Sequence, residues 1–98
     1  QRPVRRPGAL VVLAGGALRM YLTQGGRSLL LYFDGEDPGH AGLLAASADA
    51  LAAALRRGRR LSFTLDRIND AEIGRGPVTD ALRAAGFRNA PRGLSWEG

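Results

Sequence analysis

The stretch Leu18–Phe33, which reads LRMYLTQGGRSLLLYF, constrains the fold more than any other part of the chain. Leu18, Met20 and Leu22 recur at every second position, and this period is typical of a half-buried β-strand. The paired glycines that follow supply the positive φ that a tight hairpin turn requires. Ser28–Phe33 then forms a nearly unbroken apolar run, which predicts a strand in a central position or one covered on both faces.

The residues before this stretch extend the hairpin into a three-stranded antiparallel meander. Ala9–Leu13 is a continuous apolar run, and it is joined to the next strand by a short turn that contains Gly15 and Gly16. A run of this kind is consistent with a buried strand. The first third of the chain therefore predicts three consecutive antiparallel strands.

The rest of the chain alternates between helical and extended patterns. A helix is predicted by an apolar stripe in steps of four, three and four, ended by Gly58: Leu44, Ala48, Leu51 and Leu55. Alternation over Leu61–Leu65 predicts a strand. Pro77 can open a second helix, which Gly86 closes. Two short closing strands are expected at Phe87–Asn89 and Leu94–Trp96.

The order of elements predicts an α+β fold, a meander followed by α-β-α-β(β), with two helices packed on one face of a mainly antiparallel sheet. Residues 9–98 form a single domain after a linker at residues 1–8, and we expect the chain to be a fragment of a larger protein. The predicted core is a set of large apolar residues: Val11, Leu13, Leu18, Met20, Leu22, Leu30, Leu44, Leu51, Leu55, Phe63, Leu65, Leu82 and Phe87.

Composition narrows the class of function. The absence of cysteine excludes disulfides and thiolate metal sites, and no apolar run is long enough to cross a bilayer. No signal peptide is recognisable, so we expect a cytoplasmic protein without a membrane partner. The formal charge of +5 favours an acidic partner such as nucleic acid, although a solubilising surface is an equal alternative.

No catalytic set is visible in the sequence. His40 is the only histidine, and the acidic loop around it lacks the spacing of a calcium site. The glycine pairs lack the Gly-Lys-Ser/Thr that grips a nucleotide phosphate. Paired carboxylates can perform acid–base chemistry, but a surface charge network is the simpler interpretation of one mixed cluster: Asp66, Arg67, Asp70, Glu72 and Arg75. We predict neither a catalytic residue nor a metal or cofactor site in this chain.

Arginines are the strongest candidates for binding nucleic acid. Arg27 follows a Gly-Gly turn, where a guanidinium group could contact a phosphate or stack on a base, although an ion pair or a solvated position is the alternative. The full candidate set also contains a strand arginine and the cluster after the first helix: Arg19, Arg27, Arg56, Arg57, Arg59 and Arg60. Tyr21 and Tyr32 could stack on bases, but packing is the commoner role for tyrosines on strands.

Several segments together resemble a known family. The strand-turn-strand ALVVLAGGALRMYLTQGGRSLLLYF, the alanine-rich helix, the LSFTLDRI strand and the close PVTDALRAAGFRNAPRGLSW look like the C-terminal domain of Lhr-type (large helicase-related) proteins, which are ATP-dependent DNA helicases of superfamily 2. The resemblance covers the chain from about Val4 to its end. One departure is Gln24, where the family pattern often has a basic residue.

The resemblance implies a non-catalytic accessory domain of a bacterial DNA helicase that acts in DNA repair and associates with the nucleoid. ATP and magnesium would be bound elsewhere in the parent protein, since no motor motif occurs here. The expected partners are other domains of the same protein and single- or double-stranded DNA. One alternative is part of a nucleic-acid glycosylase site, for which Glu97 or Asp66 would supply the carboxylate that stabilises the sugar cation. The other alternative is a purely structural protein-interaction domain.

Overall fold

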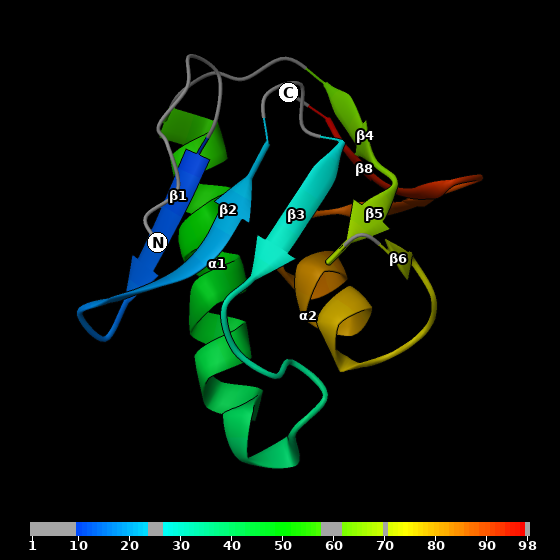
Figure 1. Cartoon of the computed structure of the whole chain (residues 1–98). Helices are drawn as coiled ribbons and strands as arrows, with labels where there is room; N and C mark the ends of the chain where they lie inside the picture. Colours follow the sequence, from blue (N-terminus) through cyan, green and yellow to red (C-terminus); the bar gives the residue numbers. More distant parts are fainter. Residues whose placement is uncertain (1–9, 24–26, 58–61, 70, 98) are drawn as a thin grey trace.

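The computed structural model describes residues 10–23, 27–57, 62–69 and 71–97 (Figure 1). Helices and strands alternate in an α+β arrangement, which confirms the predicted fold class. The elements are β1 (Leu10–Ala14), β2 (Ala17–Leu22), β3 (Ser28–Leu31), a 3₁₀ turn (Pro38–His40), α1 (Ala41–Arg57), β4 (Phe63–Leu65), β5 (Arg67–Ile68), β6 (Ala71–Glu72), α2 (Pro77–Ala85), β7 (Arg88–Ala90) and β8 (Gly93–Trp96). No helix in the described ranges is long and apolar enough to cross a membrane.

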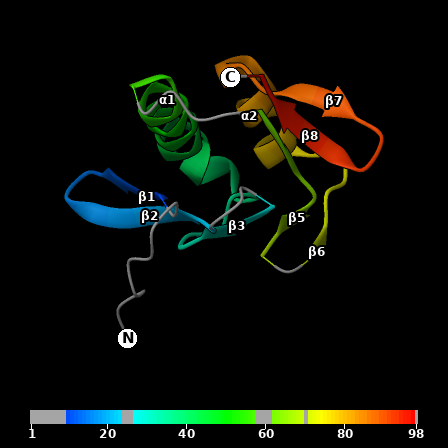
Figure 2. The ribbon, with the colours of Figure 1, turned by 90° about the horizontal axis from the view of Figure 1, so that it is seen from above.

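The strands divide between two sheets. The first has five strands in the order β1-β2-β3-β5-β6, and the second has three in the order β4-β8-β7. All pairings are antiparallel except that of β3 with β5. Seen from above, α1 lies over the meander and α2 lies between α1 and the second sheet (Figure 2). The two helices contact each other.

The meander forms as predicted, with Gly15 and Gly16 at φ values of 62° and 79° in its first turn. The register passes from Val12↔Met20 to Leu13↔Leu18, so Arg19 is the extra residue of a β-bulge. The second turn, at residues 24–26, lies outside the described residues, but the Thr23 amide donates to Ser28 O at 3.0 Å across it.

The meander buries the opposite set of side chains from the predicted one on two of its strands. Val12 and Leu29 are buried, whereas Val11 and Leu30 are only half-buried and Leu13 is 64% exposed. A strand that is apolar at every position does not show which face meets the core, because both alternations are equally apolar. Leu18 is likewise half-buried, so the prediction of a buried side chain is wrong at these four positions.

Helix α1 buries one stripe against the meander and α2. The predicted residues Leu44, Ala48, Leu51 and Leu55 are all at most 3% exposed. Across the helix pair, Leu82, Phe87, Leu94 and Trp96 complete the core, and of these the sequence predicted Leu82 and Phe87. Phe63 is half-buried and packs edge-on against Phe87, with ring centroids 6.2 Å apart.

The chain passes from one sheet to the other at Asp66. β4 pairs with β8 in the second sheet, and β5 pairs with β3 in the first. The amides of Asp66 and Arg67 both donate to Arg27 O, at 2.9 and 3.2 Å. Gly93 packs against this junction so closely that a Cβ on it would lie 2.1 Å from Leu65 O. This junction positions the candidate site described next.

Candidate nucleic-acid interface

The candidate arginines from the sequence lie in three separate places. Arg19 is the bulge residue of β2, and its Nε donates to Ala14 O at 3.0 Å beside the β1–β2 turn. Arg27 precedes β3 and is 73% exposed. Arg56 and Arg57 end α1, and Arg59 and Arg60 lie outside the described residues. The described members of the set therefore do not converge on one surface.

Arg27 forms an ion pair with Asp66. Its guanidinium lies 3.4 Å from Asp66 Oδ2, across the place where the chain changes sheets. The Asp66 side chain is 27% exposed. An exposed pair of this length contributes about 0–1 kcal/mol to stability, so a phosphate could compete for the arginine.

Arg56 contacts the end of α2 and the ring of Trp96 in the second sheet. One terminal nitrogen donates to Ala85 O at 3.0 Å, at the end of α2. The guanidinium carbon lies 5.6 Å from the centroid of the Trp96 ring, in cation–π geometry. Arg57 is exposed and has no hydrogen-bond or ion-pair partner among the described residues.

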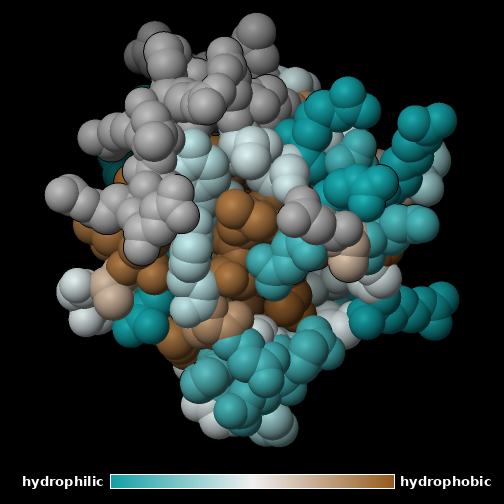
Figure 3. Space-filling view, in the orientation of Figure 1, coloured by the Kyte–Doolittle hydropathy of each residue, from teal (hydrophilic) through white to brown (hydrophobic). Residues whose placement is uncertain are grey.

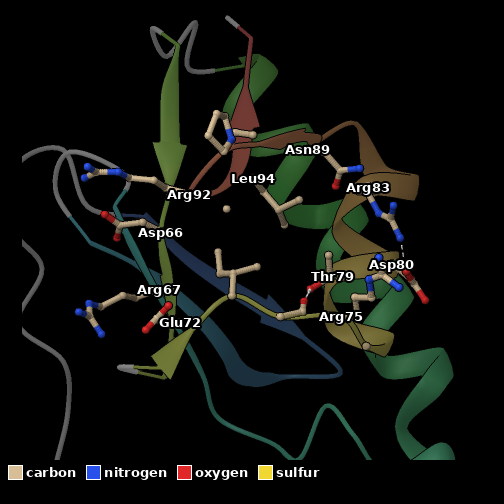
Figure 4. A pocket seen from close by; sticks show the side chains of 16 residues that line it. Asp66, Arg67, Glu72, Arg75, Thr79, Asp80, Arg83, Asn89, Arg92 and Leu94 are labelled. Atoms are coloured by element: carbon tan, nitrogen blue, oxygen red, sulfur yellow. Dashed lines mark hydrogen bonds and ion pairs between the residues drawn. The ribbon is translucent and has the colours of Figure 1, made fainter.

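The fold creates a different basic site, an open hollow of about 950 Å³ between the strand junction, α2 and the β7–β8 turn. Four arginines from separate parts of the chain line it: Arg67, Arg75, Arg83 and Arg92. Figure 4 shows Asp66, Arg67, Glu72 and Arg92 on one side, and Arg75, Thr79, Asp80, Arg83 and Asn89 on the other. Arg67 and Arg92 extend their guanidinium groups outward at the rim, away from the centre of the hollow (Figure 4).

Carboxylates neutralise part of this basic lining. Arg83 forms an ion pair with Asp80 one turn away on α2, and Glu72 is the cross-strand neighbour of Arg67. Within the described part of the chain, Arg75 and Arg92 have no hydrogen-bond or ion-pair partner. Of the four arginines that line the hollow, these two can therefore bind a phosphate without first breaking an interaction with another described residue.

A second hollow of about 560 Å³ adjoins the first. Asp66, Ala90, Pro91 and Arg92 line both, and Phe63 adds an aromatic side chain to the second. Asp66 and Arg92 therefore lie along the boundary between the two hollows, and Arg27, the ion-pair partner of Asp66, lines the second one.

Sequence reasoning noticed Arg67 and Arg75 as parts of a charge network but did not select Arg83 or Arg92. Arg67, Arg75, Arg83 and Arg92 are eight or nine residues apart in the sequence, a spacing that matches neither a helix face nor a strand face. Only the sheet junction and the β7–β8 turn bring them together. The sequence shows only that each of the four lies in or next to a short element or turn in the second half of the chain, which does not indicate a shared surface.

Other candidate groups have local roles or remain exposed. His40 Nδ1 lies 2.8 Å from Asp34 O, and its ring meets Phe33 edge-on, so it organises the loop before α1. No group of histidine, cysteine and carboxylate side chains among the described residues could hold a metal ion. Glu97 is exposed just after β8, whereas Asp70 lies outside the described residues. Asp66 is thus the acidic candidate that adjoins a hollow.

Comparison with known proteins identifies relatives along almost the whole chain, although no family model matches it. It is 46% identical over 95 residues to the Lhr helicase/uracil glycosylase of Escherichia coli, and 42% identical over 100 residues to the Lhr helicase/probable uracil glycosylase of Mycolicibacterium smegmatis. The matches cover 96% and 95% of this chain but only 6% of each relative. The resemblance found in the sequence is thereby confirmed: nearly the whole chain is similar to a segment that makes up a small part of Lhr-type helicases.

Proposed function

We propose that this chain is a non-catalytic, C-terminal accessory domain of a bacterial Lhr-type DNA helicase, and that it contacts the phosphate backbone of nucleic acid at the basic hollow. The observation that carries the proposal is the pair Arg75 and Arg92, which lie on opposite sides of the hollow and have no acidic partner among the described residues. A role in DNA repair, and ATP and magnesium bound elsewhere in the parent protein, follow from the family alone. The names of the relatives support the helicase context.

The geometry favours contact with phosphates over reading of bases. Guanidinium groups at the rim of an open hollow can reach a backbone that crosses its mouth, and arginine suits phosphate because it donates in a planar fork. We therefore expect binding that is indifferent to sequence.

The test is the salt dependence of binding by the 98-residue chain. Two phosphate contacts predict a log–log slope of about −1.8 on duplex DNA and about −1.4 on a single strand. Fluorescence anisotropy on both substrates between roughly 50 and 200 mM salt measures this slope, over which duplex affinity should fall roughly tenfold. Arg75→Ala combined with Arg92→Ala should bring the slope close to zero.

Two single variants serve as controls. Arg88 is exposed on β7 next to Asn89, and neighbouring strand residues point to opposite faces, so Arg88→Ala removes the same charge on the side away from the hollow. Its slope should match that of the parent chain. Arg57→Ala tests the alternative site at the end of α1. A slope that flattens in Arg57→Ala but not in the double variant would contradict the proposal and move the contact to the helix end.

A second candidate function is favoured by the names of both relatives, which include uracil glycosylase. Base excision passes through a cationic sugar that a carboxylate can stabilise, and Asp66 adjoins both hollows. Asp66→Asn separates the two functions. In an accessory domain it releases Arg27 and tightens DNA binding, whereas in a glycosylase it abolishes uracil release by the parent protein. Glu97→Gln is the matched variant at the exposed carboxylate, and loss of activity there alone would exclude Asp66.

A further inference from the structure

The face of the meander that points away from α1 is apolar. In the register, Val11, Tyr21 and Leu30 form one cross-strand row on this face, next to the pair Leu13 and Leu18. Leu13 and Tyr32 are 64% and 45% exposed, and they are the large apolar side chains that the described residues leave open to solvent. Figure 3 shows apolar residues gathered over the meander, with hydrophilic residues to the right and below.

This face is more apolar than a solvent-facing sheet requires. An antiparallel sheet with one wet face normally alternates apolar and polar residues. β1 reads LVVLA and β3 reads SLLL, with hardly any polar residue on either side. Helix α1 covers the side that carries Val12, Met20, Leu22 and Leu29. The sequence therefore has the pattern of a sheet covered on both faces, and among the described residues α1 covers one of them.

We propose that a neighbouring domain of the same polypeptide docks on this outer face, which we define by Val11, Leu13, Leu18, Tyr21, Leu30 and Tyr32. The inference rests on the proposed function, in which the chain is one domain of a longer Lhr-type protein. In both relatives the matching segment is about 6% of the protein, so other domains are always attached to it.

The size of the face favours an attached partner over a second copy. Two exposed side chains and four half-buried ones fall short of the roughly 800 Å² per partner that stable complexes bury. A tethered domain needs less area, because attachment raises its effective concentration. Arg19 lies at the rim beside Ala14, so the docking surface should be apolar with an acidic residue near this arginine.

The experiment uses the full-length parent protein with a photoreactive benzophenone amino acid at position 13 or position 32. The expected result is a crosslink within one polypeptide, from either position to a peptide outside these 98 residues, identified by mass spectrometry. The control carries the probe at Ala45, an exposed position on α1. Leu13→Asp should abolish the crosslink from position 32 by placing an unpaired charge in the interface.

Three results would overturn the proposal: crosslinks that join two polypeptides, crosslinks no stronger than those of the Ala45 control, and a crosslink from position 32 that survives Leu13→Asp. The outer face and the basic hollow share no residue. Retention of the salt slope of DNA binding in Leu13→Asp would therefore show that the variant is folded. The same independence keeps a failure of docking distinct from a failure of the DNA-binding proposal.

Discussion

Replacement of Arg56 by alanine should destabilise the domain, because this arginine joins the ends of the two helices to the second sheet. Its guanidinium donates to Ala85 O at 3.0 Å and lies over the Trp96 ring at 5.6 Å. Ala85 is the last residue of α2, so its carbonyl is one of those that the helix itself leaves without a partner. Trp96 is 5% exposed, and its ring also contacts Phe87.

The size of the effect follows from these contacts. A hydrogen bond from a charged donor contributes about 1.5–3 kcal/mol, and the partly exposed position of this one places it at the low end. A cation–π contact at an exposed site adds about 0.5–1 kcal/mol. Ordering a long side chain costs up to about 2 kcal/mol. The two gains sum to about 2–2.5 kcal/mol, and because Arg56 stays partly exposed the ordering cost offsets only part of them. We therefore expect Arg56→Ala to lower the free energy of unfolding by about 1–2 kcal/mol, and Tm should fall by roughly 4–8 °C for each kcal/mol lost.

The assay is urea denaturation followed by tryptophan fluorescence, for which Trp96 is the only tryptophan in the chain. Arg57→Ala is the matched control. It also removes one positive charge at the end of α1, but the Arg57 side chain has no partner among the described residues. Its effect should stay within about 0.5 kcal/mol. Equal losses in the two variants would refute the reasoning, because the loss would then reflect charge near the helix end and not the contacts with Ala85 and Trp96.

Three further predictions concern packing and ligands. Gly93→Ala should cost about 1–3 kcal/mol or more by overpacking against Leu65 O, whereas Gly42→Ala, which has open space in α1, should be neutral or stabilise by up to about 1 kcal/mol; thermal melts of the two variants measure the contrast. Leu51→Ala should cost about 2–5 kcal/mol in denaturant titrations, because Leu51 is fully buried, and a loss below about 0.5 kcal/mol would remove it from the core. Calorimetric titration of the chain with ATP should show no saturable binding, since the sequence has no phosphate-binding glycine loop and no lysine.

Local signals were sufficient to predict the meander, the two helices, β4 and the closing strands, whereas the segment that forms β5 and β6 was expected to be a loop with at most a small hairpin. The Gly15–Gly16 turn and the apolar spacing of α1 each specify a structure without reference to the rest of the chain. The buried face of β1 and β3 could not be predicted, because their two faces are almost equally apolar and a bulge at Arg19 shifts the register. The division into two sheets was also invisible, since β4 and β5 are one extended stretch that changes partners at Asp66.

The candidate site depended on tertiary structure to a greater degree. Sequence clustering drew attention to Arg56, but the fold directs this side chain to Ala85 and Trp96. Arg75 and Arg92 adjoin no other arginine in the sequence, and they line the same hollow because α2 and the β7–β8 turn border it. Residues that are close in the sequence share a surface in a predictable way only when they belong to one helix or strand. Arg75 lies in the loop before α2 and Arg92 in the β7–β8 turn, so their spacing in the sequence carries no such information.

The distribution of charge limits how strongly the domain alone can bind nucleic acid. The described residues contain nine arginines and eight carboxylates, so they carry only +1 of the formal net charge of +5. Five arginines lie outside the described residues: Arg2, Arg5, Arg6, Arg59 and Arg60. The lining of the hollow is mixed in charge as well, since Asp66 lines it together with Arg92, and the Glu36 carboxylate lies next to the lining residue Gly76. Binding through Arg75 and Arg92 alone therefore cannot exceed a duplex slope of about −1.8. The measured slope could be steeper than this, and the part beyond about −1.8 could persist when Arg75→Ala and Arg92→Ala are combined. That result would mean that arginines outside the described residues also bind phosphates and release counterions.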